Sequence, residues 1–451
     1  MSVRLLDSLG TTAPLADLFS DHSILCAMLM FEAALARAEA RYKIVPQNAA
    51  DAIAKAAQSE GFDVATIIQE TRLSATPGVP LVKALTERVR VQNSAAVEFV
   101  HWGATSQDVC DTALVLLLKQ AQPILESDLL RLEKVLHRLG AQHARTVMPG
   151  RTLLQAAGPV TFGLKAAGWL AAIHRSHKRL NAAFKESLQL QFGGATGTLA
   201  ALGNDGITVG ESMAQDLGLS YPEAPWHTQR DRLANLLCCC GVLAGSVAKM
   251  ARDISLLTQT EVGEVTERTG EGRGSSSSMP HKANPVGCTQ TLAATSGIPG
   301  LVSTFLSAMV QEQERAVGGW QAEWPIVAGI IQRTGLGVSA MAETIEGLTV
   351  DQARMRANLE ATRGTVFAEK ATMLLAGKIG HDAARKLVEE AVRKSADQKR
   401  QLSEVLGEMP EVKHHLDPAT LRDLESPEQY LGVGDEFRKR LLDSVKEHGS
   451  S

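Results

Sequence analysis

Residues 233–254 read LANLLCCCGVLAGSVAKMARDI, and small or apolar residues recur along this stretch at alternating spacings of four and three. The positions are Leu233, Leu237, Cys240, Ala244, Val247, Ala251 and Ile254. Such a heptad seam predicts a helix whose seam packs against other helices. The helical pattern extends over residues 228–264, which at 1.5 Å per residue would span roughly 50 Å, too long for one compact domain to surround.

Further long helices are indicated on both sides of this stretch. A second seam follows Pro123, which we expect to begin or kink that helix, and it consists of Leu125, Leu129, Leu132, Leu136 and Leu139. Other helical candidates are residues 159–190, 287–315 and 325–348. Five long helices predict an all-α fold with a central bundle, and seams on such long rods indicate self-association.

The chain is expected to form three helical domains. These are an N-terminal helical domain over residues 1–110, a central long-helix bundle over 111–350 and a smaller helical domain over 351–451. The length of 451 residues is sufficient for three domains with a large buried core.

Charge and composition argue against several classes of partner. The formal net charge is only -4, so nothing indicates nucleic acid. We expect no signal peptide and no apolar run of membrane-spanning length, and therefore a cytoplasmic protein without a membrane partner. The six cysteines lack the spacing of a disulfide framework or a zinc site. On a helix, Cys238, Cys239 and Cys240 would point about 100° apart, so they cannot converge on one metal.

Residues 274–285, GSSSSMPHKANP, form the segment most indicative of chemistry. The glycine and serines offer amides and hydroxyls as donors, and Pro280 and Pro285 restrict the far side of the loop. Lys282 and Asn284 would then lie at a defined distance from the serines, an arrangement that suits a carboxylate. Serine-rich segments are more often linkers, but the patterned end of this segment argues against a linker.

Two other segments carry polar groups in a similar context. Residues 101–112 read HWGATSQDVCDT, where Thr105 and Ser106 precede a long helix and can hold a carboxylate, with ordinary helix capping as the alternative. Residues 150–163 read GRTLLQAAGPVTFG and include Arg151 and Gln155.

These three segments, in this order, resemble the signature regions of the fumarase/aspartase superfamily, which includes class II fumarase, aspartase and adenylosuccinate lyase. The resemblance implies that Ser276 is the catalytic base, that Lys282 and Asn284 bind the substrate carboxylate, and that His101 assists the leaving group. It also implies a homotetramer in which each site draws its segments from three subunits.

One departure from the family pattern narrows the chemistry. Leu153 stands where the family usually has a histidine, and an apolar side chain cannot relay a proton, so the hydratase and amine-lyase interpretations lose a part they need. Leu153, residues 225–232 (PWHTQRDR) and residues 314–325 (ERAVGGWQAEWP) resemble the carboxymuconate cycloisomerase branch of the family. The implied reaction is ring closure of a muconate tricarboxylate to a lactone, in the breakdown of aromatic compounds.

A substrate with three negative charges requires several cationic or donor groups. The predicted catalytic residues are Ser276, His101 and Lys282. The predicted substrate-binding residues are Thr105, Ser106, Arg151, Gln155, Ser277, Asn284, Arg315 and Arg230. For Arg230 and Arg315 the alternative is a salt bridge to a nearby acid such as Asp231 or Glu314. The reaction is expected to need neither a metal nor a cofactor.

Two alternatives stay open at this point. One is an adenylosuccinate-lyase-like elimination enzyme, which Leu153 weakens. The other is a non-catalytic structural relative on the same scaffold, against which Ser276, Lys282 and Asn284 together argue.

Overall fold

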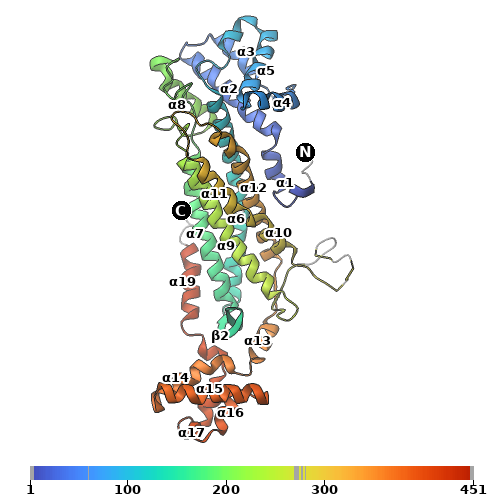
Figure 1. Ribbon diagram of the computed structural model, residues 1–451, viewed down its shortest axis with the longest axis vertical. Coiled ribbons are helices and arrows are strands. Elements are labelled where there is room, and N and C mark those ends of the chain that lie inside the picture. The colour runs from blue at the N-terminus through green and yellow to red at the C-terminus, as the bar shows by residue number, and fades with distance from the viewer. Residues whose placement is uncertain (1–4, 59, 269–273, 276–277, 280, 447–451) are drawn as a thin grey trace. The chain divides into compact units, whose positions relative to one another are not determined.

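The computed structural model describes residues 5–58, 60–268, 274–275, 278–279 and 281–446. Within these residues the chain forms helices α1 to α19, five short 3₁₀ helices and two small two-stranded sheets (Figure 1). The predicted all-α fold is confirmed.

The chain divides into two compact units. Unit 1 comprises Met1–Leu129, Ser176–Ala248 and Gln290–Ala340, and unit 2 comprises Leu130–Arg175, Lys249–Thr289 and Met341–Ser451. The unit boundaries fall inside five helices, which are α6 (Ser106–Gln142), α7 (Phe162–Ser187), α9 (Asp231–Leu257), α10 (Val286–Ser296) and α12 (Gly319–Glu346). The three-domain division stays a prediction.

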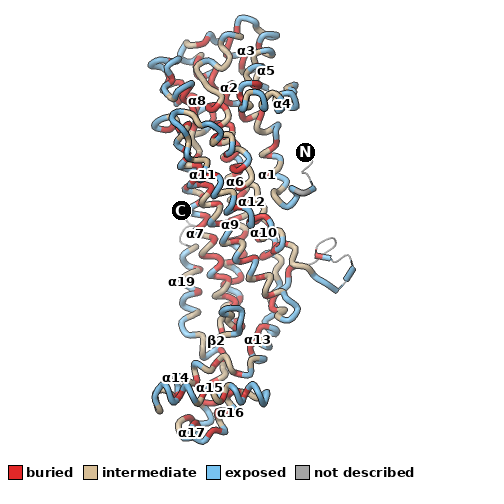
Figure 2. Tube along the Cα trace, viewed as in Figure 1, coloured by how far each residue is buried: buried red, intermediate tan, exposed pale blue. Residues whose placement is uncertain are grey.

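The heptad seam of α9 is buried as predicted. All seven seam positions are at most 2% exposed, and Figure 2 shows buried positions recurring along this helix. The helix is shorter than predicted, because the chain leaves it after Leu257 and turns at Gly263, whose φ of 60° is the left-handed value that favours glycine.

Three helix predictions require correction. Helix α6 starts at Ser106 and runs through Pro123, so the proline does not begin it, and the alternative of a kink at Pro123 stays a prediction. The predicted helix 287–315 is two helices, α10 (Val286–Ser296) and α11 (Ile298–Ala308), because Pro299 lacks the N–H that would continue the ladder of α10. Residues 155–161, part of which was predicted as helix, form a strand before α7.

The short sheets of unit 2 were not predicted from the sequence. Strands β1 (Val147–Thr152) and β2 (Gln155–Thr161) form an antiparallel hairpin, and β3 (Val265–Thr266) pairs with β4 (Thr349–Val350). Leu153 and Leu154 connect β1 to β2 with φ values of 49° and 64°, the signs expected of a type I′ turn. Leucine rarely adopts these values, and the side chains are 96% and 73% exposed.

Among the remaining helices of unit 1, α2 (Asp21–Arg41) contacts α1, α3, α4 and α8, and α5 packs against α3 and α4. Their bounds are α1 Ala13–Leu18, α3 Gln47–Ala56, α4 Val64–Ser74, α5 Gly78–Gln92 and α8 Gly206–Leu217. The short 3₁₀ helices of this unit are Leu5–Asp7, Ser94–Phe99 and Gly203–Asp205.

Among the C-terminal helices of unit 2, α14 to α18 enclose a separate apolar cluster that includes Phe367, Leu375, Val388, Leu406 and Leu424. Their bounds are α13 Gln352–Glu360, α14 Ala368–Ile379, α15 His381–Gln398, α16 Leu402–Glu408, α17 Pro410–Lys413, α18 Pro418–Leu424 and α19 Gly434–Lys446. The 3₁₀ helices here are Thr365–Phe367 and Pro427–Tyr430.

Helix α9 corrects one further expectation. Contrary to the expectation from sequence, α9 is long and apolar enough to cross a membrane by length and composition. Half of its most apolar stretch is buried inside the structure, and the core helix of a helical bundle passes the same test.

Candidate active site

His101 lies in the turn after the 3₁₀ helix Ser94–Phe99 of unit 1 and contacts a buried acid. Its Nδ1 lies 2.6 Å from Oε1 of Glu32 on α2, and the Glu32 side chain is fully buried while that of His101 is 16% exposed. Burial alone would lower the pKa of His101, but the charge and hydrogen bond of Glu32, with a smaller effect of Asp108, outweigh it and raise the pKa. The imidazole therefore favours its charged form.

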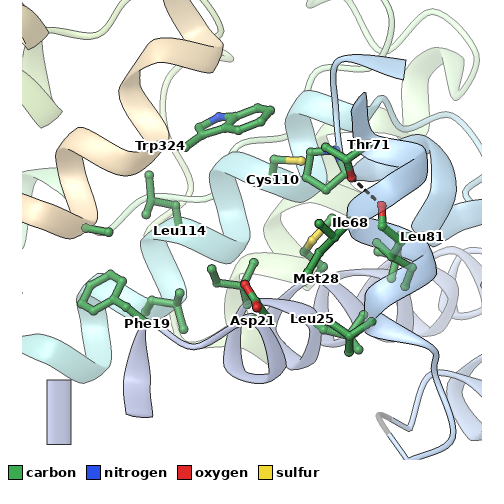
Figure 3. A pocket seen from close by; sticks show the side chains of 16 residues that line it. Phe19, Asp21, Leu25, Met28, Ile68, Thr71, Leu81, Cys110, Leu114 and Trp324 are labelled. Atoms are coloured by element: carbon green, nitrogen blue, oxygen red, sulfur yellow. Dashed lines mark hydrogen bonds between the residues drawn. The ribbon is translucent and has the colours of Figure 1, made fainter. Parts of the chain in front are cut away.

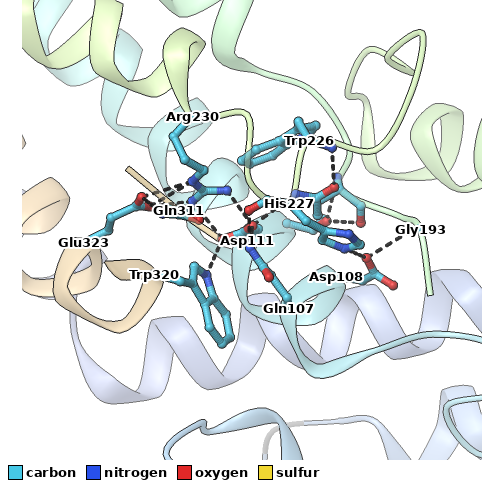
Figure 4. Close-up of polar contacts among 12 residues, drawn as sticks. Gln107, Asp108, Asp111, Gly193, Trp226, His227, Arg230, Gln311, Trp320 and Glu323 are labelled. Atoms are coloured by element: carbon cyan, nitrogen blue, oxygen red, sulfur yellow. Dashed lines mark hydrogen bonds and ion pairs between the residues drawn. The ribbon is translucent and has the colours of Figure 1, made fainter. Parts of the chain in front are cut away.

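The start of α6 carries Thr105 and Ser106, as predicted, and is held by the carboxylate of Asp108. Asp108 accepts hydrogen bonds from the amides of Thr105, Gly193 and Gly194 at 2.9 to 3.0 Å, and its Oδ1 lies 2.7 Å from Nε2 of the buried His227 (Figure 4). A Cβ on Gly194 would lie 2.7 Å from a backbone oxygen, so glycine is required for this close approach. Asp108 therefore caps the N-terminus of α6.

Arg230 lies in a buried cluster of charges. Its guanidinium donates to both carboxylate oxygens of Asp111 at 2.8 and 3.1 Å and to those of Glu323 at 2.6 to 3.2 Å (Figure 4). Its side chain is fully buried, and it stacks 4.7 Å from the ring centre of Trp226. The geometry favours the ion-pair alternative for Arg230, although the partners are not the neighbouring acid Asp231.

The two acids of the cluster have pKa values that are shifted in opposite directions. Burial alone would raise the pKa of Asp111, but the charge and hydrogen bonds of Arg230 lower it. Burial raises the pKa of Glu323, and Arg230 offsets this only in part. Trp320 Nε1 also donates to Asp111 at 2.9 Å. The cluster therefore joins α6, α12 and the start of α9.

Arg315 is linked to this cluster through Gln107. It donates to Gln107 Oε1 at 3.0 Å and to the backbone oxygens of Gly194 and Ala195 at 3.3 and 2.9 Å, and it is partly exposed. Because these partners are neutral, the positive charge of Arg315 is not neutralised by them. Neither Asp231 nor Glu314 is its partner in these contacts.

In unit 2, the hairpin separates the two predicted binding residues Arg151 and Gln155. Arg151 pairs with Ala156 and Thr152 pairs with Gln155, so the side chains of Arg151 and Gln155 leave opposite faces of the hairpin. Arg151 donates to both oxygens of the buried Glu264 at 2.6 and 2.9 Å, whereas Gln155 is exposed. Only one of the two can face a given ligand on that hairpin.

The serine loop is described in part. Ser276 and Ser277 lie outside the described residues; Lys282 is exposed and Asn284 partly exposed. The amide of Asn284 donates to the oxygen of Gly274 at 3.0 Å. At the start of α10, Glu267 accepts from the amides of Gly287 and Cys288 at 2.9 and 3.0 Å. The two ends of the loop are thereby joined in unit 2.

An apolar cavity of unit 1 does not fit the predicted substrate. Its volume is about 260 Å³, and it is lined by side chains that include Phe19, Met28, Leu114 and Trp324 (Figure 3). Asp21 is the one carboxylate in its lining. Transfer of three carboxylates into such a cavity would be costly, so the cavity is not assigned to the substrate.

The comparisons with known proteins identify the family. The family model described as lyase matches residues 9–300, and the one described as adenylosuccinate lyase C-terminus matches residues 364–441. A 3-carboxy-cis,cis-muconate cycloisomerase from Bradyrhizobium diazoefficiens is 45% identical over 98% of this chain and 98% of its own length. This chain belongs to the lyase family whose model matches residues 9–300. The resemblance predicted from the signature segments is thus confirmed.

Other lyases of the family are similar over nearly their full length. The crystal structure of 3-carboxy-cis,cis-muconate lactonizing enzyme from Pseudomonas putida matches with a TM-score of 0.92 and 42% identity, covering 99% of each chain. A nitrosuccinate lyase from Streptomyces davaonensis is 40% identical over 95% of this chain and 92% of its own length. The scaffold therefore carries more than one named reaction at similar identity.

The acidic partners of the site were missed from the sequence. Glu32, Asp111, Glu264, Glu267 and Glu323 all contact predicted site residues or the base of the serine loop. A signal existed for Glu32, which interrupts the otherwise apolar run 24–36 of α2. A charge within such a run is expected to be buried and paired.

Replacing Arg230 with Met should lower the stability of the fold rather than only the affinity for substrate. The change leaves Asp111 and Glu323 buried without their counter-charge, which costs about 3–5 kcal/mol. Denaturant unfolding measures this, with Arg315→Met as the control, since its lost hydrogen bonds go to neutral groups and should cost about 1–2 kcal/mol. Unchanged stability with a raised KM in Arg230→Met would instead assign Arg230 to the substrate.

Glu39 generates a pH-dependent prediction. Its carboxyl is buried, and burial followed by repulsion from Glu32 raises its pKa from 4.5 to about 9. The folded protein then binds more protons than the unfolded chain, so stability falls as pH rises from 4.5 towards 9.

Glu39→Gln removes this dependence and should stabilise the protein at pH 8, relative to wild type, by on the order of a few kcal/mol. The two proteins should differ much less at pH 5. Thermal unfolding at both pH values tests this, and an equal difference at pH 5 and pH 8 would contradict it.

Proposed function

We propose that this lyase converts 3-carboxy-cis,cis-muconate to 4-carboxymuconolactone. The observation that carries the proposal is the 45% and 42% identity to a cycloisomerase and a lactonizing enzyme over almost the whole chain. Leu153 is consistent with it, because the hairpin tip offers no proton-relaying group where other branches of the family have a histidine.

The reaction is an intramolecular addition. One carboxylate oxygen of the substrate adds to an alkene carbon, and a proton is delivered to the neighbouring carbon. In the reverse direction a base removes the proton alpha to a carboxylate, an aci-carboxylate dianion forms, and the lactone oxygen leaves from the beta carbon. The leaving group is a stable carboxylate and needs little acid assistance, which accounts for Leu153.

We assign the proton transfer to Ser276. The pKa of its hydroxyl must be lowered by loop amides and nearby positive charge. Lys282 and Asn284 hold the carboxylate next to the reacting carbon, with Ser277 as a further donor. These four assignments come from the resemblance of the loop to the family signature.

His101 supplies a cationic group whose charge Glu32 supports. Thr105 and Ser106 supply hydroxyls at the start of α6, where helix amides favour anions. Arg315 adds a positive charge, and within the described part of the chain its hydrogen bonds go to neutral groups. These groups suit a ligand with three negative charges.

Two predicted substrate ligands are assigned a different role. Arg230 joins Asp111 and Glu323, and Arg151 joins Glu264, so both hold the elements that carry other site residues. Of the two predicted ligands on the hairpin, Gln155 is then the one assigned to the substrate.

A homotetramer with sites shared between subunits and a cytoplasmic location belong to the same proposal. Seams of small residues on long helices support self-association. The tricarboxylate nature of the substrate follows from the proposed reaction.

The direct test mixes the purified protein with 3-carboxy-cis,cis-muconate and follows the loss of the conjugated diene absorbance, with NMR to identify the lactone. We expect rapid turnover, and a loss of several orders of magnitude in Ser276→Ala with an unchanged fold by circular dichroism. Adenylosuccinate and nitrosuccinate serve as parallel substrates. Cleavage of either one without lactone formation would refute the cycloisomerase assignment.

A further inference from the structure

We propose that Glu32 is a positioning residue for the reaction: its buried carboxylate holds the imidazole of His101 in one orientation and in the charged form, with Nε2 left for the substrate. The inference rests on the proposed function, in which His101 acts on a tricarboxylate. Glu32 itself does not touch the reacting atoms.

The contact between the two side chains is short and shielded from water. Nδ1 of His101 donates to Oε1 of Glu32 at 2.6 Å, and the Glu32 side chain is fully buried. Within the described residues, Oε2 of Glu32 has no hydrogen-bond partner. Hydrogen bonds to ionised groups are the short and strong ones, and a carboxylate removed from water depends on such a partner. The negative charge of Glu32 is therefore directed at His101.

The backbone fixes the imidazole from the other side. His101 has a φ of 59°, a left-handed value that costs a non-glycine residue energy and persists only where the surroundings hold it. Gly103, two residues later, has a φ of 69°, and its oxygen lies against Gly194. With the backbone turn fixed and Nδ1 bonded to Glu32, the orientation of Nε2 is determined.

The charges around His101 come from two helices. Glu32 lies on α2 and Asp108 on α6, and both favour the imidazolium against the opposing effect of burial. Asp108 is already bonded to three backbone amides and to His227. Glu39, two helical turns from Glu32, has a pKa of about 9 and is therefore uncharged at neutral pH. Glu32 is thus the carboxylate in contact with His101.

This helix offers a matched pair of variants. Glu32→Gln keeps the shape and a hydrogen-bond acceptor but removes the charge, whereas Glu39→Gln replaces an already neutral carboxyl on the same helix. Loss of an opposite charge in contact should lower the pKa of His101 by about one to three units. In a plot of kcat/KM against pH, the alkaline limb should move to lower pH by the same amount in Glu32→Gln. It should not move in Glu39→Gln.

Two measurements separate positioning from a structural role. The first is NMR titration of the His101 Cε1–H signal, assigned by its absence in His101→Asn, which reports the pKa without any substrate. The second is the pH profile of lactone formation. A structural role would lower activity equally at all pH values, whereas the proposal predicts that Glu32→Gln recovers activity as pH falls. Glu32→Asp, which keeps the charge, should retain the alkaline limb of wild type.

The outcomes are distinct. A lower pKa of His101 together with a shifted alkaline limb supports the proposal. An unchanged pKa of His101 in Glu32→Gln overturns it. A lowered pKa of His101 without a shift in the alkaline limb of the activity profile also overturns it, because the reaction would then not use the charged imidazole. If the wild-type protein forms no lactone, the proposed function fails, while the titration still decides whether Glu32 controls His101.

Discussion

The ion pairs of Arg230 with Asp111 and Glu323 are the constraint on which the site residues of unit 1 depend. A guanidinium without solvent exposure is stable only with its counter-charges in contact. Asp111 lies on α6 and Glu323 on α12, so the pairing fixes the start of α9 against both helices. Thr105 and Ser106 begin the same helix as Asp111, and their positions follow from this arrangement.

In unit 2, buried carboxylates likewise fix the elements that carry predicted site residues. Glu264 holds the hairpin through Arg151 and also accepts from Asn358 of α13 at 2.9 Å. Glu267 accepts from the first amides of α10 and so fixes one end of the serine loop. In both units, predicted site residues lie next to buried acids that accept hydrogen bonds from protein groups. Of the predicted substrate ligands, Lys282 is exposed and Arg315 is partly exposed, so both side chains are open to solvent.

Periodicity and motif order were sufficient to predict the helical bundle and the family. The seam from Leu233 to Ile254 repeats locally, so a single sequence contains all the information on which side of α9 is buried. The partners of the site residues could not be predicted this way, because Arg230 and Asp111 are 119 positions apart and Arg151 and Glu264 are 113 apart. Their pairing is decided by packing. The break between α10 and α11 could have been predicted, because Pro299 lacks a backbone N–H. The turn at Leu153 and Leu154 could not, because leucine rarely adopts a left-handed φ.

The resemblance to the lyase family predicts that His101 and Ser276 act together in one site that is shared between subunits. Mixing His101→Asn with Ser276→Ala after dissociation and reassociation tests this directly, because a mixed tetramer can contain sites with neither change. We expect each variant alone to be inactive and the mixture to regain measurable lactone formation. No recovery in mixed tetramers, with assembly verified by native mass spectrometry, would contradict the account.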